Sequence, residues 1–238
     1  MNERIQEQIF PVSTTEFDAA FDGIKGLTWL PWVGQQYSSK KILVLGESHY
    51  CYDSHTPLEI EHYRNETREV VAEYVNDPQA GNQYKTFAPI TQILNNTMCP
   101  GQSRVQVWSQ IAFMNLIQAC MQNNSHRPHW EQFLRGWRVV LEIISYLRPN
   151  VCICFSTDKM RNRINFNRLE EFTEKIPFAY SITHTEDTAE RIGRCIVASP
   201  GKICIGQYGC YVIFIQHASR IKGQAIDRWI EFLNKTIS

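Results

Sequence analysis

The chain has 238 residues, enough for one large domain or two small ones, and no shift in composition marks a boundary between domains. Lys and Arg together number 24, and Asp and Glu together also number 24, so the net charge is zero. The chain as a whole therefore does not attract a polyanion, and any contact with nucleic acid must rest on local basic patches. No stretch approaches the ~18 consecutive apolar residues of a membrane span. We therefore expect one cytoplasmic domain over 1–238 without membrane contact.

The first predicted strand is the apolar run at 42–45, which ends at Gly46. A run without polar alternation is typical of a strand buried on both faces of a parallel sheet. A polar cluster follows it directly: Glu47, Ser48, His49 and Tyr50. Because ligands of open α/β sheets bind at the carboxyl ends of the strands, we expect this loop to form one wall of a site.

A charged stretch comes next, and its loosely periodic apolar residues predict a helical insertion at about 52–86, either a lid or a surface helix. Another helix is predicted over 87–94. The apolar run at 111–117 predicts a second strand, with Asn115 inside it. From Pro128 the apolar residues recur at helical spacing until about Arg148, which predicts a long amphipathic helix.

The apolar run at 151–155 follows this helix and predicts a third strand, so that helix and strand alternate as in a parallel sheet. Helical character is also expected over 159–175. The pattern does not fix the arrangement of 178–209. The clearest late strand is 211–216, and an amphipathic helix over 223–236 follows it. We predict a three-layer α/β/α fold with a central, mainly parallel, four-stranded sheet.

Eight cysteines raise the question of disulfides and metals. Cys152 and Cys154 alternate within a predicted strand, and Cys204 and Cys210 flank apolar strands, where reduced cysteine acts as a small hydrophobic residue. No C-x-x-C pair is present, which argues against structural zinc and iron–sulfur clusters. We expect buried free thiols, and no cofactor or metal.

Five positions along the chain resemble motifs of the uracil-DNA glycosylase superfamily, and four of them follow one another in the order found in that family. G-E-S-H-Y at 46–50 is similar to the G-Q-D-P-Y or G-E-x-P-G motif after the first strand of that family, and H-A-S-R at 217–220 to its H-P-S-P motif after the last strand. Asn115 matches the asparagine that reads the base, and 148–149 the Lys-Pro pair before a strand. The pair at 127–128 falls where some branches carry Arg-Pro. The chain resembles a divergent member over roughly residues 40–236.

The resemblance implies an enzyme that flips a base out of DNA and hydrolyses its N-glycosidic bond, with uracil or another modified base as substrate. His217 would donate to the carbonyl oxygen of the base, and Asn115 would hold its pairing edge. Glu47 would act as the base for water, with His49 or Asp53 as substitutes. The rest of the substrate site would comprise Gly46, Ser48, His49, Tyr50 as a wall and Phe87 as a stacking face. Three residues beside the second motif would contact DNA phosphates: Ser219, Arg220 and Lys222.

Departures from the family pattern keep other functions open. Ser48 stands where the best-known branch has an acid, and His49 and Ala218 replace the prolines of the two motifs. The main alternative is a catalytically inactive module on the same fold, which binds a nucleic acid, single- or double-stranded, or a nucleotide. A third alternative makes Ser48 a nucleophile with His217 as its base, although Tyr50 replaces the second glycine of G-x-S-x-G. Four residues near the first motif fit no metal-ligand spacing: His49, Cys51, His55 and His62.

Overall fold

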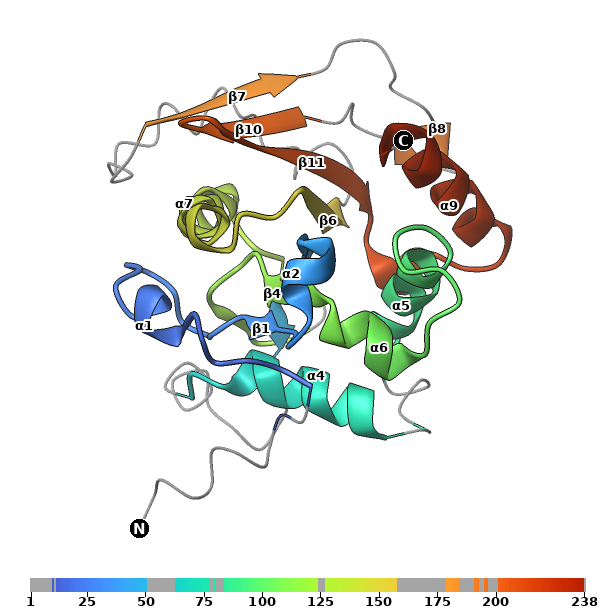
Figure 1. Ribbon diagram of the computed structural model, residues 1–238, viewed down its shortest axis with the longest axis horizontal. Coiled ribbons are helices and arrows are strands. Elements are labelled where there is room, and N and C mark those ends of the chain that lie inside the picture. Colours follow the sequence, from blue (N-terminus) through green and yellow to red (C-terminus); the bar gives the residue numbers. More distant parts are fainter. Residues whose placement is uncertain are drawn as a thin grey trace.

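The computed structural model describes residues 10, 12–50, 63–77, 79, 84–123, 127–157, 179–184, 191–192, 195–196 and 201–237. The first part of the predicted insertion, 51–62, lies outside these residues, and so does the helix expected over 159–175. The polypeptide forms a mixed α/β structure in which helices lie on both sides of one large sheet (Figure 1).

The main sheet has seven strands in the order β1-β4-β2-β6-β11-β10-β7. Their bounds are β1 (Trp32–Val33), β2 (Ile42–Gly46), β4 (Ile111–Asn115), β6 (Val151–Thr157), β7 (Tyr180–His184), β10 (Gly201–Ile205) and β11 (Tyr208–Gln216). The four strands predicted from apolar runs, β4, β2, β6 and β11, are neighbours and pair in parallel.

The predicted sheet of four strands was too small, because three further strands pair antiparallel at its edges. β1 has only two residues, and β10 alternates between buried and partly buried side chains. Such short or half-exposed edge strands lack the continuous apolar run that marks a strand buried on both faces. Two additional small sheets pair β3 (His49–Tyr50) with β5 (Cys120–Met121), and β8 (Arg191–Ile192) with β9 (Cys195–Ile196).

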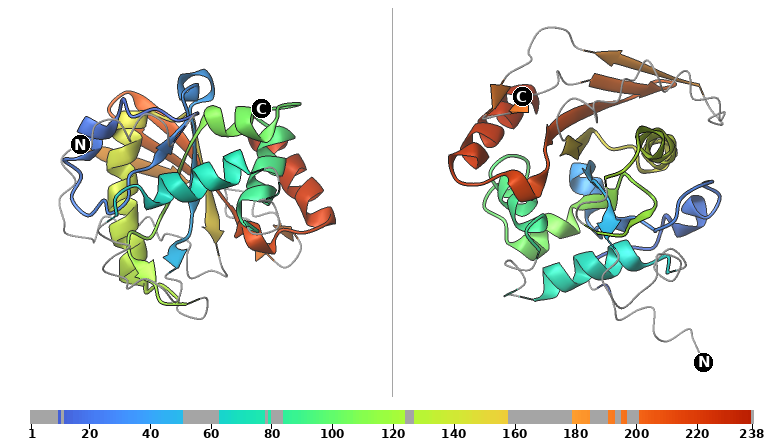
Figure 2. Two further views of the ribbon diagram at one scale, coloured as in Figure 1. Left: turned by 90° about the horizontal axis from the view of Figure 1, so that it is seen from below. Right: turned by 180° about the vertical axis from the view of Figure 1, so that it is seen from behind.

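Two hydrophobic clusters, one on each face, hold the sheet between its helices. The first contains residues of α1 (Asp18–Phe21), α2 (Tyr37–Lys40) and the predicted long helix, α7 (Trp130–Leu147). The second contains residues of α4 (Glu66–Asn76), α5 (Phe87–Asn95), α6 (Arg104–Ser109) and α9 (Gln224–Ile237). Figure 1 and the two views of Figure 2 show α7 on one side of the sheet and α5, α6 and α9 on the other.

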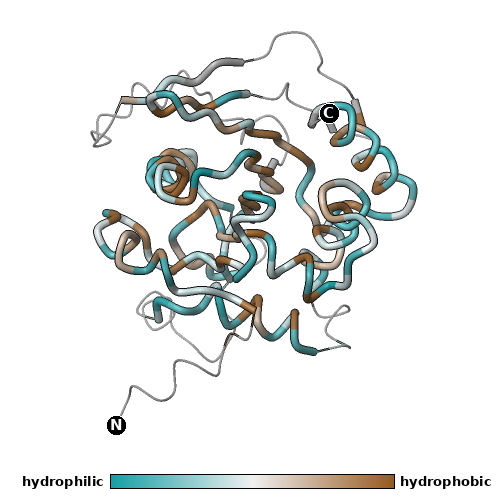
Figure 3. Tube along the Cα trace, in the orientation of Figure 1, coloured by the Kyte–Doolittle hydropathy of each residue, from teal (hydrophilic) through white to brown (hydrophobic). Residues whose placement is uncertain are grey.

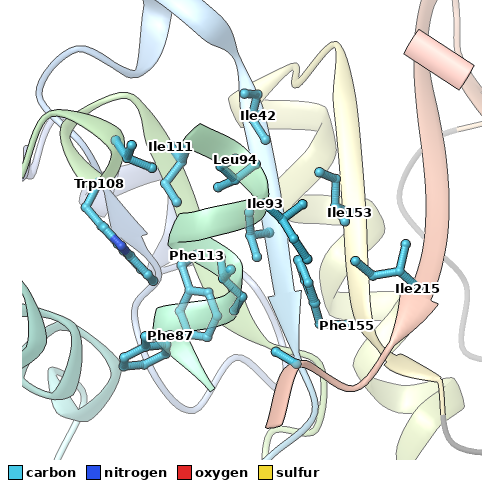
Figure 4. Packing of buried hydrophobic residues seen from close by; sticks show 14 of the residues in the cluster. Ile42, Phe87, Ile93, Leu94, Trp108, Ile111, Phe113, Ile153, Phe155 and Ile215 are labelled. Carbon is cyan, nitrogen blue, oxygen red and sulfur yellow. The ribbon is translucent and has the colours of Figure 1, made fainter. Parts of the chain in front are cut away.

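The central strands contribute to both clusters, which explains their unbroken apolar sequences. Figure 4 shows one isoleucine from each central strand directed into the second cluster: Ile42, Ile111, Ile153 and Ile215. Figure 3 shows the corresponding concentration of hydrophobic residues along the inner strands and on α7. Among the described helices, none combines the length and the apolar character needed to cross a membrane.

Helix α4 lies inside the range predicted as an insertion and is part of the core. Its residues Val71, Tyr74 and Val75 are buried in the second cluster. The Arg68 guanidinium, 2% exposed, donates to both carboxylate oxygens of Asp18 and to the carbonyl oxygen of Pro31. Because a buried arginine on α4 is fastened to the N-terminal segment, this helix is neither a detachable lid nor a simple surface helix.

The prediction of buried free thiols is confirmed for four cysteines, holds in part for the free but only partly buried Cys204, and is wrong for one. Free thiols are present at Cys99, Cys152, Cys154, Cys204 and Cys210. Cys120, the first residue of β5, is disulfide-bonded. Disulfide formation depends on two Cα atoms brought within about 4.4–6.8 Å by the fold. Spacing along the chain does not reveal such a contact.

Candidate functional site

The site begins where two neighbouring parallel strands end. Gly46, the last residue of β2, is the register partner of Asn115, the last residue of β4. A Cβ atom on Gly46 would lie 2.2 Å from Asn115 Oδ1 and 3.0 Å from Phe113 Cζ. Only glycine therefore permits the amide of Asn115 to lie over the backbone of β2.

Asn115 presents a nearly buried amide at this edge. The residue is 8% exposed, and its own carbonyl oxygen accepts a hydrogen bond from Gln118 Nε2 at 2.7 Å. Within the described part of the chain, no hydrogen bond engages the Asn115 side chain. An amide offers a donor and an acceptor in one plane, which is the pattern needed to read the edge of a flat heterocycle.

Glu47 follows Gly46 and is buried, with a side chain only 2% exposed. Its Oε1 lies 2.8 Å from Nη1 of Arg127, whose side chain is 46% exposed. The backbone N–H groups of Leu116 and Ile117 donate to the carbonyl oxygens of Gly46 and Glu47, so the loops after β2 and β4 are bonded to each other. The structure thus holds a charge-compensated carboxylate on the residue that follows the register partner of Asn115.

Arg127 is a site residue that the sequence prediction did not assign. The Arg-Pro pair at 127–128 was recognised only as a position of resemblance. Its partner Glu47 lies 80 residues away in the sequence. No local spacing signals an ion pair over such a separation, and only the approach of the α7 N-terminus to the β2 edge brings the two groups together.

His49 occupies a structural position. Its Nε2 lies 2.9 Å from Thr67 Oγ1, and its ring packs on Trp29 with ring centroids 4.5 Å apart. Burial lowers the pKa of His49 to about 4, because the charged imidazolium would lose its hydration. The imidazole is therefore neutral near pH 7, and it anchors α4 to the loop instead of facing a ligand as a charged group.

The two neighbours of His49 in this loop differ in their surroundings. Ser48 Oγ is buried and has no hydrogen-bond partner among the described residues. Tyr50 is partly buried against the first hydrophobic cluster and lies opposite Met121 in the small β3–β5 sheet. Ser48 is thus an unsatisfied hydroxyl within the first motif, while Tyr50 packs as part of a wall.

His217 directly follows β11 and precedes the 3₁₀ turn η2 (Ala218–Arg220). Its Nδ1 lies 2.8 Å from Ser219 Oγ, so Ser219 fixes the orientation of the imidazole. Ala218 and Ile221 are buried and anchor the turn, whereas Arg220 is exposed. Lys222, which follows the turn, is exposed as well.

The strand order determines how the two motifs face each other. β6 separates β2 from β11, and all four central strands run parallel. Gly46 and His217 therefore lie at the same edge of the sheet with β6 between them, and the pairing register places His217 further along the strand direction than Gly46.

Phe87 lies behind this edge. Although it begins α5 as predicted, it is 6% exposed and its ring is enclosed by four other aromatic rings: Tyr74, Tyr84, Trp108 and Phe113. The Phe87 and Phe113 ring centroids are 5.2 Å apart, and Phe113 is the ring that approaches Gly46. The ring expected to stack on a base is instead packed into the core (Figure 4).

Two alternative chemistries receive no support from the described residues. The hydrogen bond of His217 Nδ1 goes to Ser219 and not to Ser48, so these residues form no nucleophile–base pair. In the described part of the chain, no three His, Cys, Asp or Glu side chains gather where they could hold a metal ion. Cys51, His55 and His62 lie outside the described residues.

Neither of two comparisons with known proteins found a match. No protein-family model matches the chain, and no curated protein matches it. The functional argument therefore rests on an amide without a described side-chain partner, a buried carboxylate paired with a half-exposed arginine, and an oriented imidazole at one edge of the central parallel strands.

Proposed function

We propose that this protein is a DNA glycosylase that hydrolyses the N-glycosidic bond of uracil or another modified base. The observation that carries the proposal is the Asn115 amide, which is 8% exposed, has no described side-chain partner and lies over Gly46, the residue that precedes the buried Glu47. The polar atoms of this amide are not sealed in the core, so its donor and acceptor remain available to a ligand with complementary groups.

The chemistry assigns a separate task to each residue. Asn115 pairs with the edge of the flipped base, and His217 donates a hydrogen bond to its carbonyl oxygen. As the bond between the sugar C1′ and the base nitrogen breaks, the electron pair leaves with the base, and the imidazole stabilises the developing negative charge. A water oxygen then bonds to C1′, and the Glu47 carboxylate accepts the proton that the water releases. Arg127 orients that carboxylate.

The architecture supports the same proposal. The parallel strands β4, β2, β6 and β11, with helices on both faces, agree with the three-layer α/β/α arrangement expected of a uracil-DNA glycosylase-like fold. The first motif follows β2, the asparagine ends β4 and the second motif follows β11. The motif residues are thereby gathered at the edge where α/β proteins bind ligands.

A specific observation favours the second candidate, a binding module without catalysis. Ser48 occupies the place of the family's acid, and one oxygen of Glu47 is already engaged by Arg127. A carboxylate held in this way retains its charge but has less capacity to accept a proton from water. Such a protein would bind an unpaired base or a nucleotide through Asn115 and His217 and release it unchanged.

End-labelled oligonucleotides containing uracil, hypoxanthine or xanthine, as single strands and duplexes, test both candidates. After incubation, alkali breaks the strand wherever a base has been removed. The glycosylase predicts strand breaks at one of these bases. Tight binding of abasic DNA without any breaks, in protein shown to be folded, would favour the binding module, and the absence of both binding and cleavage would contradict both candidates.

A further inference from the structure

A pocket of about 360 Å³ lies beside the site, on the α7 side of the sheet. Its walls come from three places in the sequence: the segment 25–28, the loop 117–119 after β4, and the first half of α7. The volume is at the lower end of the range of small-molecule sites, which is about 300–1,000 Å³. Asn115 and Glu47 do not line it, so this pocket is distinct from the edge described above.

The packing of α7 shapes the pocket floor. A Cβ atom on Gly136 would lie 2.1 Å from the carbonyl oxygen of Leu116, so the helix approaches the loop after β4 only because this residue is glycine. Arg138, with a side chain 10% exposed, donates to the carbonyl oxygen of Lys25 at 2.7 Å and pairs with Glu142 at 3.1 Å. Arg138 thus fastens the N-terminal wall to the helix.

The charged side chains that line the pocket are all cationic: Lys25, Arg135 and Arg138. None of the described lining residues is acidic. Glu142 pairs with Arg138, and the exposed lining residues Lys25 and Arg135 lie at the mouth. Two exposed cations over a concave surface raise the local positive potential in a chain whose net charge is zero.

Gln118 connects this pocket to the candidate site. Its Oε1 accepts from the backbone N–H groups of Thr28 at 3.0 Å and Trp29 at 3.3 Å, and its Nε2 donates to the carbonyl oxygen of Asn115 at 2.7 Å. Trp29 in turn packs on His49. One amide therefore holds a pocket wall and the backbone of Asn115 at the same time.

We propose that this pocket binds a phosphate ester of nucleotide size or smaller. A guanidinium and an ammonium at the mouth match the charge of a phosphate, and the planar fork of Arg135 can donate two parallel hydrogen bonds to it. Ile117, Ala119 and Val139 supply an apolar wall for the remainder of the ligand. The phosphate comes from a free nucleotide or from a nucleic-acid backbone. The pocket would serve this role whether or not the neighbouring edge cleaves bases.

Calorimetric titration of the full chain with uridine 5′-monophosphate, with uridine as its phosphate-free partner, tests the assignment. We expect the monophosphate to bind and uridine to bind at least about tenfold more weakly. Lys25→Glu and Arg135→Glu should each weaken monophosphate binding by about tenfold or more. Arg228→Glu, which reverses an exposed charge on α9, should leave it unchanged.

Lys25 and Arg135 are exposed, so both charge reversals should preserve the fold, and equal melting temperatures would establish this. If a charge-reversal variant does not fold, Lys25→Ala or Arg135→Ala is measured in its place. A short single-stranded oligonucleotide separates the two phosphate sources. If it binds more tightly than the monophosphate and loses the same affinity in the variants, the ligand is a backbone phosphate. If it binds more weakly than the monophosphate, the ligand is a free nucleotide. Equal affinity for uridine and its monophosphate, or affinities unaffected by both reversals, would overturn the proposal.

Discussion

The side-chain oxygen of Asn115 lies 2.2 Å from the position that a Cβ atom on Gly46 would occupy. The two residues end adjacent parallel strands and are register partners. The last residue of β2 must therefore be glycine for the amide of β4 to adopt its position at the edge. This contact joins the first predicted motif to the residue predicted to read the base.

Replacing Gly46 by alanine should disturb both the fold and the site. The added methyl group would collide with Asn115 Oδ1 and touch Phe113 Cζ, and overpacking of this kind costs about 1–3 kcal/mol of unfolding free energy. Urea denaturation would measure the loss. Gly23→Ala is the matched control, because no atom lies within 4 Å of a Cβ there, and its effect should stay within about 0.5 kcal/mol. Equal effects of the two substitutions would contradict the described contact.

Removing Arg127 should leave a buried carboxylate without its described cationic partner. Glu47 is 2% exposed, and an uncompensated buried group costs about 1–3 kcal/mol, with the lower part of that range expected because Arg127 is half exposed. Chemical denaturation of Arg127→Ala would measure the change. The Arg64–Asp22 pair is exposed on both sides, so Arg64→Ala should cost less than about 1 kcal/mol. Similar losses in both variants would mean that Arg127 does not compensate Glu47.

His49 should make the protein sensitive to mild acid. Its pKa is about 4 in the folded protein against the ordinary histidine value of 6.5, so the unfolded chain binds an extra proton between these values. Stability contributed by the neutral imidazole is present above about pH 6.5 and is lost as the pH falls towards 4, by about 3 kcal/mol in all. The free energy of unfolding of wild type and His49→Gln, measured at about pH 7.5 and about pH 4.5, separates the contribution of His49 from that of the carboxylates. An identical loss of stability on acidification in the two proteins would contradict it.

Arg220 and Lys222 should contribute to nucleic-acid affinity through charge alone. Both are exposed beside His217, and a lysine or arginine that contacts a phosphate releases a counterion. Arg220→Ala and Lys222→Ala should each lower the slope of log affinity against log salt by about 0.7–0.9, measured by fluorescence anisotropy with a labelled oligonucleotide. Arg228→Ala on α9 should leave the slope unchanged. Slopes equal to that of wild type in the first two variants would remove these residues from the binding surface.

The centre of the fold could be predicted because its signals are local. Strands buried on both faces require unbroken apolar runs, and α7 requires apolar residues at helical spacing, so both are visible in the sequence. β1 has two residues and β10 is half buried, so the sequence pattern of neither strand can be told from that of a loop. The antiparallel edges therefore become visible only when neighbouring strands supply their hydrogen bonds.

The candidate site shows the same division. Gly46 and Asn115 could be placed together because adjacent parallel strands end at one edge. The ion pair of Glu47 with Arg127, the enclosure of Phe87 and the burial of His49 against Trp29 depend on tertiary contacts between distant segments. Side-chain environments of this kind have no signature in residue type or spacing.

Single-turnover cleavage of a modified base in an end-labelled oligonucleotide tests the central claim most directly. Wild type should break the strand after alkali, and His217→Ala and Asn115→Asp should each lose about two orders of magnitude or more in rate, as expected when a preorganised donor is removed. Arg228→Ala, with the same melting temperature, should cleave as wild type does. Full cleavage by both site variants would contradict the assignment of this edge, and no cleavage of any modified base by folded wild-type protein would contradict glycosylase activity.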